Sequence, residues 1–211
     1  MVYTDLATIK LQAMEEAERL IGNLNRKSSH SFRNRYDHTL RVLNWADRIQ
    51  KVEGGDPEII AFAVLFHDTG WSDKVNHALV GAELAEKFLR GKGIDPDLVE
   101  RISSAVRTHN NRWEPQNDLP IENLVVMDAD FLDEVGVTTL VWDSLAAASE
   151  DKPGYLKVLE RDLKFYKSSK EKVTFLRTET GLKLYKERLE IWEGCINQLK
   201  YELGVSDDFG T

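Results

Sequence analysis

Apolar residues recur at steps of three and four along most of the chain, and this spacing limits the fold more than any other feature. In the first segment the apolar positions are Leu6, Ile9, Ala13, Ala17, Leu20 and Leu24. Such spacing places apolar side chains on one face of an α-helix, whereas a half-buried strand needs strict alternation. The pattern therefore predicts an all-α protein.

Proline and glycine divide this pattern into separate helices. Asp56-Pro57 and Asp95-Pro96 each place a capping side chain before a proline at the first helical position, and Gly54-Gly55 marks a helix end. Ser31 is the expected cap of the second helix. The expected helices cover residues 5–24, 32–52, 58–68, 76–90, 96–109, 121–135, 137–150, 154–169 and 173–203. Leu124–Met127 is a strand candidate, but its flanks continue the helical pattern, which favours a helix.

The composition is that of a soluble globular protein, because 42% of the 211 residues are hydrophobic and 30% are charged. We expect one helical domain over residues 1–211, with a core over about 31–150 and a C-terminal helical extension over about 151–205. The longest apolar run, residues 59–66, is far shorter than the ~20 residues of a membrane span. The net charge of −8 argues against a nucleic-acid polymer as partner.

Two features of the C-terminal third bear on location and assembly. Cys195 is the single cysteine and cannot form an internal disulfide, so a cytoplasmic location is expected. Residues 172–203 carry an apolar stripe that offers a surface for a homodimer. Packing of the same stripe on its own domain is the simpler alternative.

Histidines and aspartates stand at the ends and inner faces of the predicted helices. His67-Asp68 closes an apolar helix, where a buried charge is costly unless it is paired or metal-bound. His38 and His109 fall on the apolar stripes of their helices, and His77 opens a helix with a small-residue face. Each position alone also fits a structural histidine, so the argument rests on the set.

Asp130 completes this set, because it lies one helical turn after Val126 and is expected to point inward. A buried aspartate needs a cation, which could be an arginine such as Arg41 or a metal ion. Histidine nitrogen with carboxylate oxygen is a ligand set for Mn, Fe, Zn, Co or Ni at an open catalytic site. A structural zinc site built from cysteines is excluded.

The order of these residues resembles the HD superfamily of metal-dependent phosphohydrolases. The family pattern is a histidine, a His-Asp doublet and a distant aspartate, found here within Tyr36–Val42, Leu65–Gly70 and Asp128–Asp133. His77 and His109 match further histidines of the family. The resemblance covers about residues 31–150 and implies an HD-like helical bundle with an added C-terminal helical segment.

The resemblance also implies a metal site and a reaction. The implied ligands of one divalent metal (Mn, Fe, Ni, Co or Zn) are His38, His67, Asp68 and Asp130. His77 and His109 would hold a second metal or face the substrate phosphate. Asp68 would also orient the attacking water, and Lys74 would contact phosphate unless it is a solvated surface residue. The implied activity is hydrolysis of a phosphate ester or anhydride in a nucleotide or another small phosphorylated metabolite.

Trp71 occupies a position where many family members carry lysine or glutamate, which disfavours several known subfamilies.

Two other functions fit the same residues. HD-type di-iron oxygenases share the ligand pattern and use both extra histidines for iron. A non-catalytic helical sensor or interaction module is the third interpretation, although a complete ligand set argues against it. Trp71, Trp113 and Phe131 could stack on a nucleotide base or pack in the core.

Overall fold

The computed structural model describes residues 5–25, 32, 34–71, 76–113, 118–150 and 153–206. These residues form helices joined by turns and contain no strand, so the predicted all-α class is confirmed. Leu124–Met127 lies inside a helix, and the strand alternative is wrong. No helix in the described ranges is long and apolar enough to cross a membrane.

The chain forms two compact units, Met1–Asp130 and Phe131–Thr211. The boundary falls before residue 151, where the C-terminal extension was expected to begin. A single domain over the whole chain stays a prediction. The first unit contains α1 (Leu6–Asn25), α2 (Arg35–Glu53), α3 (Pro57–Phe66), α4 (His77–Gly91), α5 (Pro96–Thr108) and most of α6 (Ile121–Leu132).

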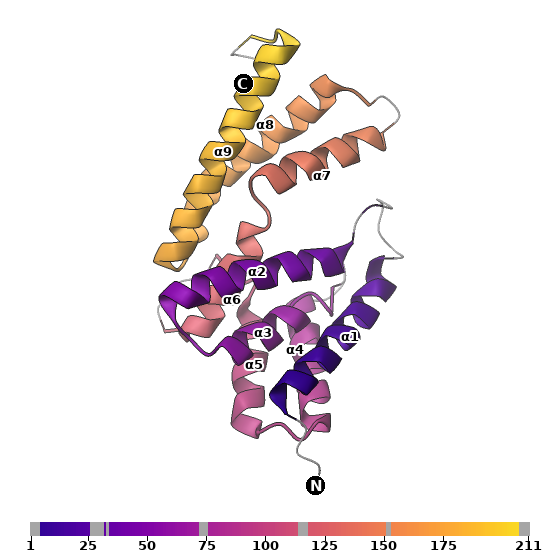
Figure 1. The fold of residues 1–211 in the computed structure, drawn as a ribbon, viewed down its shortest axis with the longest axis vertical. Coiled ribbons are helices and arrows are strands. Elements are labelled where there is room, and N and C mark those ends of the chain that lie inside the picture. The colour runs from indigo at the N-terminus through magenta and orange to yellow at the C-terminus, as the bar shows by residue number, and fades with distance from the viewer. Residues whose placement is uncertain are drawn as a thin grey trace. The chain divides into compact units, whose positions relative to one another are not determined.

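Helix α3 is the centre of the first unit. It contacts α1, α2, α4 and α5, which surround it in Figure 1. Residues Ile59 to Phe66 are buried apart from the half-buried Ala61. A helix that is apolar on all sides is stable only in such a position. The end of α3 therefore delivers the residues that follow it into the interior of the unit.

The predicted caps of α3 and α5 are confirmed, and that of α2 is different. Asp56 accepts a hydrogen bond from the Glu58 N–H at 2.9 Å, and Asp95 caps α5 in the same way. Helix α2 begins at Arg35 instead of residue 32, because the Asn34 side chain accepts a hydrogen bond from the Tyr36 N–H at 3.0 Å. Ser31, the expected cap, lies outside the described residues.

Helix α3 ends at Phe66, earlier than the predicted end at Asp68. The next residues form a tight turn, in which the Thr69 N–H bonds to the Phe66 carbonyl at 3.2 Å. The Trp71 N–H then bonds to the Asp68 carbonyl at 3.1 Å. Bonds between residues three apart tighten the chain at a helix end. His67 and Asp68 consequently stand in a turn at the end of the buried helix.

Two glycines allow α4 to approach this turn. A Cβ atom on Gly81 would lie 2.7 Å from the Phe66 carbonyl oxygen, and one on Gly70 would lie 2.6 Å from the Gly81 nitrogen. The small-residue face predicted for α4 is confirmed, since its buried members are Ala78, Gly81, Ala82 and Ala85. This close backbone approach brings His77, at the start of α4, toward the His67-Asp68 turn.

The second unit contains α7 (Val137–Ala148), α8 (Tyr155–Glu171), the 3₁₀ helix η1 (Lys172–Phe175) and α9 (Glu179–Leu203). The single helix predicted over 173–203 is wrong, because Leu176 is extended and Thr178 starts α9 by capping the Gly181 N–H at 2.9 Å. The core includes Trp192, whose indole N–H donates to Asp162 at 3.0 Å. Burial raises the pKa of Asp162 to about 7.

The contact between Gly81 and Phe66 leads to a stability prediction. Gly81→Ala should lower the free energy of unfolding by about 1–3 kcal/mol, because the added methyl group meets backbone that cannot rotate away. Urea unfolding followed by circular dichroism measures the change. Gly91→Ala is the matched control on the same helix, since a Cβ there meets nothing within 4 Å. Equal stability of the two variants would contradict this interpretation of the α3–α4 contact.

Candidate metal centre

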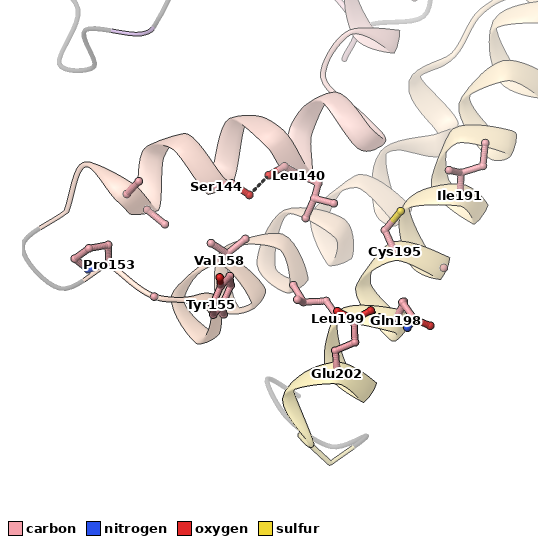
Figure 2. A pocket seen from close by; sticks show the side chains of 14 residues that line it. Leu140, Ser144, Pro153, Tyr155, Val158, Ile191, Cys195, Gln198, Leu199 and Glu202 are labelled. Carbon is pink, nitrogen blue, oxygen red and sulfur yellow. Dashed lines mark hydrogen bonds between the residues drawn. The ribbon is translucent and has the colours of Figure 1, made fainter.

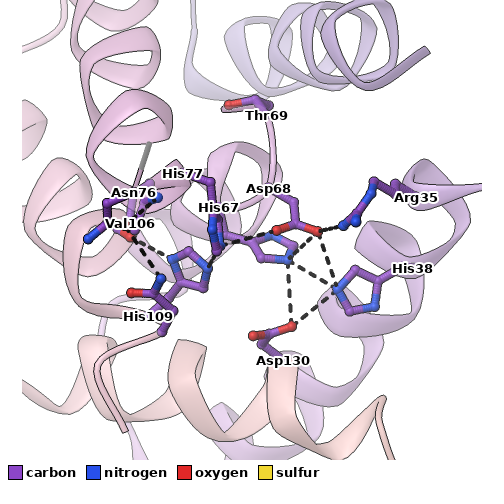
Figure 3. Close-up of polar contacts among 12 residues, drawn as sticks. Arg35, His38, His67, Asp68, Thr69, Asn76, His77, Val106, His109 and Asp130 are labelled. Atoms are coloured by element: carbon purple, nitrogen blue, oxygen red, sulfur yellow. Dashed lines mark hydrogen bonds and ion pairs between the residues drawn. The ribbon is translucent and has the colours of Figure 1, made fainter. Parts of the chain in front are cut away.

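Residues from five elements of the first unit converge on one interior point (Figure 3). The contributing side chains are His38 of α2, His67 and Asp68 of the turn after α3, His77 of α4, His109 just after α5 and Asp130 of α6. These are the six residues of the implied metal and phosphate site. The structure therefore brings together side chains that lie up to ninety-two positions apart, from 38 to 130, in the chain.

The first cluster joins His38, His67 and Asp68, with Asp130 beside it. The Nε2 atoms of His38 and His67 lie 3.3 Å apart. Asp130 Oδ1 lies 3.1 Å from His38 Nε2 and 3.7 Å from His67 Nε2. Asp68 Oδ2 lies 4.0 Å from each of these two imidazole nitrogens. Four ligand-type side chains thus present atoms to one small volume.

The second cluster joins Asp68, His77 and His109. The two histidines place their Nε2 atoms 3.2 Å apart, and His77 Nε2 lies 3.6 Å from Asp68 Oδ1. Asp68 is common to both clusters, but it offers Oδ2 to the first and Oδ1 to the second. A carboxylate shared in this way is suited to bridging two cations.

Two of the histidines are oriented by the helices that precede them. His67 Nδ1 lies 2.6 Å from the Val64 carbonyl oxygen, and His109 Nδ1 lies 2.7 Å from that of Val106. A carbonyl only accepts hydrogen bonds, so the proton of each neutral ring is on Nδ1. Each Nε2 then presents a lone pair to the site, as a metal ligand requires.

Burial and charge determine the protonation of the site. Burial lowers the pKa of His109 to about 4 and also lowers the pKa of His77, so both rings are neutral at pH 7. Burial opposes ionisation of Asp68, but the imidazoles of His67 and His38 hold its pKa below the ordinary value. Burial also opposes ionisation of Asp130, but the Arg112 guanidinium holds the pKa of that carboxyl well below its ordinary value.

Two arginines that the sequence analysis did not single out as binding partners complete the site. Arg35 donates to Asp68 Oδ2 at 3.0 Å, and its guanidinium carbon lies 3.8 Å from the centre of the Trp71 ring. Arg112 donates to Asp130 Oδ2. Arg35 stands three residues before His38, so its place on one helix face was a usable signal. Arg112 lies in a loop, where no periodicity applies.

The donor atoms fit a transition-metal ion. Ligands bound at about 2.1 Å place their neighbours about 3.0 Å apart when they meet at a right angle. The separations among His38, His67 and Asp130 run from 3.1 to 3.7 Å, close to this spacing. Lys74, the expected phosphate contact, lies outside the described residues.

The aromatic residues considered for base stacking have different surroundings. Phe131 is buried and stacks on Tyr185 in the core of the second unit, with ring centres 5.1 Å apart. Trp71 lies against Arg35, and Trp113 is 71% exposed. A cavity of about 830 Å³ opens among α7, α8 and α9 (Figure 2), but none of the predicted site residues lines it. The candidate chemistry therefore belongs to the first unit.

Comparison with protein families and sequences gives two matches. Residues 35–134 match the model of the HD domain family. A protein of Bacillus subtilis strain 168 named "Putative phosphohydrolase YueE" is 31% identical over 113 residues. That match covers 46% of this chain and 64% of the relative, so the chain spans less than two thirds of that protein.

Solved structures share the fold at lower identity. The Lin1889 protein of Listeria innocua is 23% identical with a TM-score of 0.62, covering 97% of this chain and all of that chain. An HD-superfamily hydrolase of Bacillus thuringiensis is 18% identical with a TM-score of 0.64, covering 93% of this chain and all of the other. Bacillus subtilis YpgQ, in a complex with ADP, is 20% identical with a TM-score of 0.62 and covers 93% and 96% of the two chains.

The depressed pKa of His109 predicts a pH-dependent stability for the metal-free protein. The pKa of His109 is about 4 in the folded chain and about 6.5 in the unfolded chain. The contribution of neutral His109 to the free energy of unfolding is therefore complete above pH 6.5 and is lost as the pH falls toward 4. From pH 7 to pH 5 the free energy of unfolding of the wild type should fall by about 2 kcal/mol more than that of His109→Gln. Urea unfolding of both proteins after removal of metal by a chelator measures this difference.

The difference between wild type and variant separates the effect of the His109 site from that of titrating groups elsewhere in the chain. Asp162 acts in the opposite sense, because its raised pKa makes the fold more stable as the pH falls below about 7. Both proteins carry Asp162, so its effect cancels. If the two proteins differ in free energy of unfolding by the same amount at pH 7 and pH 5, His109 does not titrate with a depressed pKa.

Proposed function

We propose that this protein, whose residues 35–134 match the HD domain family, is a metal-dependent phosphohydrolase. Its substrate would be a phosphate ester or anhydride in a nucleotide or another small phosphorylated metabolite. The observation that carries the proposal is the convergence of four imidazole Nε2 atoms with two carboxylates inside one buried site. The similarity to a relative named as a phosphohydrolase supports the same reaction class.

The first cluster is the proposed site of one divalent transition metal, among Mn, Fe, Ni, Co and Zn. Its ligands would be His38, His67, Asp68 and Asp130. When bound, the metal supplies a water of lowered pKa and neutralises charge on a phosphoryl oxygen. The backbone bond from His67 Nδ1 to Val64 holds the ring in the ligating tautomer. Asp68 would orient the attacking water, and the position of its second oxygen outside the first cluster supports this role.

His77 and His109 have two roles open to them. With Asp68 they form the second trio, which fits a second metal ion. As neutral rings they could alternatively hydrogen-bond a substrate phosphate. Their 3.2 Å separation and the shared Asp68 favour the two-metal arrangement. A Lys74 contact with phosphate stays a prediction of the sequence.

The charge of the site supports an anionic substrate. The carboxylates Asp68 and Asp130 are each paired with a guanidinium, so the ion pairs of the site carry no net charge before a divalent ion binds. A bound ion gives it a surplus of positive charge that would attract phosphate. YpgQ binds ADP in its crystal structure, which supports a nucleotide as the substrate class here. A cytoplasmic location and a homodimer also stay predictions.

The second trio also keeps a di-iron oxygenase as the alternative function. Such an enzyme would use both clusters for iron and would consume oxygen. Metal analysis of protein purified anaerobically without a chelating resin separates the two proposals. Iron at about two ions per chain with oxygen consumption would favour the oxygenase, whereas phosphate release with Mn²⁺ or another divalent ion would favour the hydrolase.

Removal of a ligand should abolish both metal binding and hydrolysis. We expect His67→Ala and Asp130→Ala to retain less than about 1% of the wild-type rate, because one missing ligand disrupts the reactive water. Phosphate release from a panel of nucleotides, with metal content by mass spectrometry, measures both effects. Glu86→Gln is the control, since this carboxylate pairs with Arg107 on the outside of the unit. Full activity in either ligand variant would refute the proposed site.

A further inference from the structure

The two carboxylates of the centre are held differently. Asp68 presents one oxygen to each cluster, and Arg35 contacts the oxygen that faces the first cluster. Asp130 presents only Oδ1 to the histidines, while its Oδ2 is occupied by Arg112. One carboxylate is therefore available to both clusters, and the other is confined to one.

Arg112 is placed to hold Asp130 in this orientation. Its side chain is 13% exposed and that of Asp130 is 11% exposed, so the pair is shielded from water. A hydrogen bond between charged groups is stronger than a neutral one, and it fixes the plane of the carboxylate. Arg112 also follows His109 by three residues, so one short segment supplies a ring to the second cluster and a guanidinium to the first.

The pairing has two opposing consequences for a cation. The fixed carboxylate keeps Oδ1 3.1 Å from His38 Nε2, where a shared ion would meet both atoms. The positive guanidinium, however, repels a divalent ion and withdraws the second oxygen of Asp130. Orientation of Asp130 strengthens metal binding, and the charge of Arg112 weakens it. The change in metal affinity when Arg112 is replaced therefore shows which of the two effects is larger.

We propose that Arg112 is a positioning residue that confines Asp130 to one-oxygen ligation of the metal at the first cluster. This inference rests on the proposed metal site and adds to it a residue outside the ligand set. Because outer residues that orient ligands commonly contribute 10- to 100-fold in metal affinity, orientation should outweigh the repulsion. Arg112 acts through Asp130 and needs no contact with the substrate.

The test is Mn²⁺ binding to the full chain by isothermal titration calorimetry, with the electron paramagnetic resonance spectrum of bound Mn²⁺ as a second readout. Arg112→Gln should weaken Mn²⁺ binding about 10- to 100-fold and alter the spectrum, because Asp130 is free to rotate. Arg112→Lys keeps the charge and one hydrogen bond, and it should recover part of the affinity. Circular dichroism of the metal-free variants confirms that they are folded.

Arg101→Gln is the matched control. Arg101 also pairs with a carboxylate of α6, since it donates to Glu122 at 2.9 Å, but Glu122 lies two turns before Asp130 and outside both clusters. We expect unchanged Mn²⁺ affinity and an unchanged spectrum in this variant. Wild-type affinity in Arg112→Gln, or tighter binding, would overturn the positioning role. Failure of the wild type to bind Mn²⁺ or any other divalent metal would instead overturn the proposed function on which the inference rests.

Discussion

Two buried carboxylates, Asp68 and Asp130, are the feature on which the first unit depends. An isolated buried carboxylate would be strongly destabilising or would take up a proton. Here each is paired with an arginine and faced by imidazoles, and both pKa values stay low despite burial. The fold can keep negative charge in its interior because α2 and the loop after α5 bring cations to it.

Two of the histidines in the site are oriented by the ends of helices. His67 and His109 follow the last residues of α3 and α5, and each donates from Nδ1 to a carbonyl three residues earlier. Carbonyl groups in the last turn of a helix lack intrahelical partners. Each ring therefore binds a carbonyl of the last helical turn, while its other nitrogen is directed into the site. The same hydrogen bond from Nδ1 both links the ring to the end of its helix and orients the ring as a ligand.

The periodic parts of this structure were predictable, and the irregular parts were not. Asp56 and Asp95 as caps, the buried α3 and the small-residue face of α4 follow from local rules, and the structure confirms them. The break before α9 was missed because Leu176 and Leu182 were joined into one apolar stripe, although they are six positions apart and Thr178 starts a new helix. Arg112 was missed because its role depends on Asp130, eighteen residues away, and a loop position has no periodicity to reveal it.

The early end of α3 has a direct bearing on the chemistry of the site. Neighbouring residues on a continuing helix point about 100° apart. Here both side chains point into the site, although His67 keeps helical backbone dihedral angles. The turn that replaces the helix, stabilised by the bond from the Thr69 N–H to the Phe66 carbonyl, places His67 Nε2 and Asp68 Oδ2 4.0 Å apart. It also leaves Asp68 Oδ1 facing His77, which α4 can approach because Gly70 and Gly81 carry no side chains. One aspartate can thus contact both clusters because it stands at the end of α3, where α4 approaches closely.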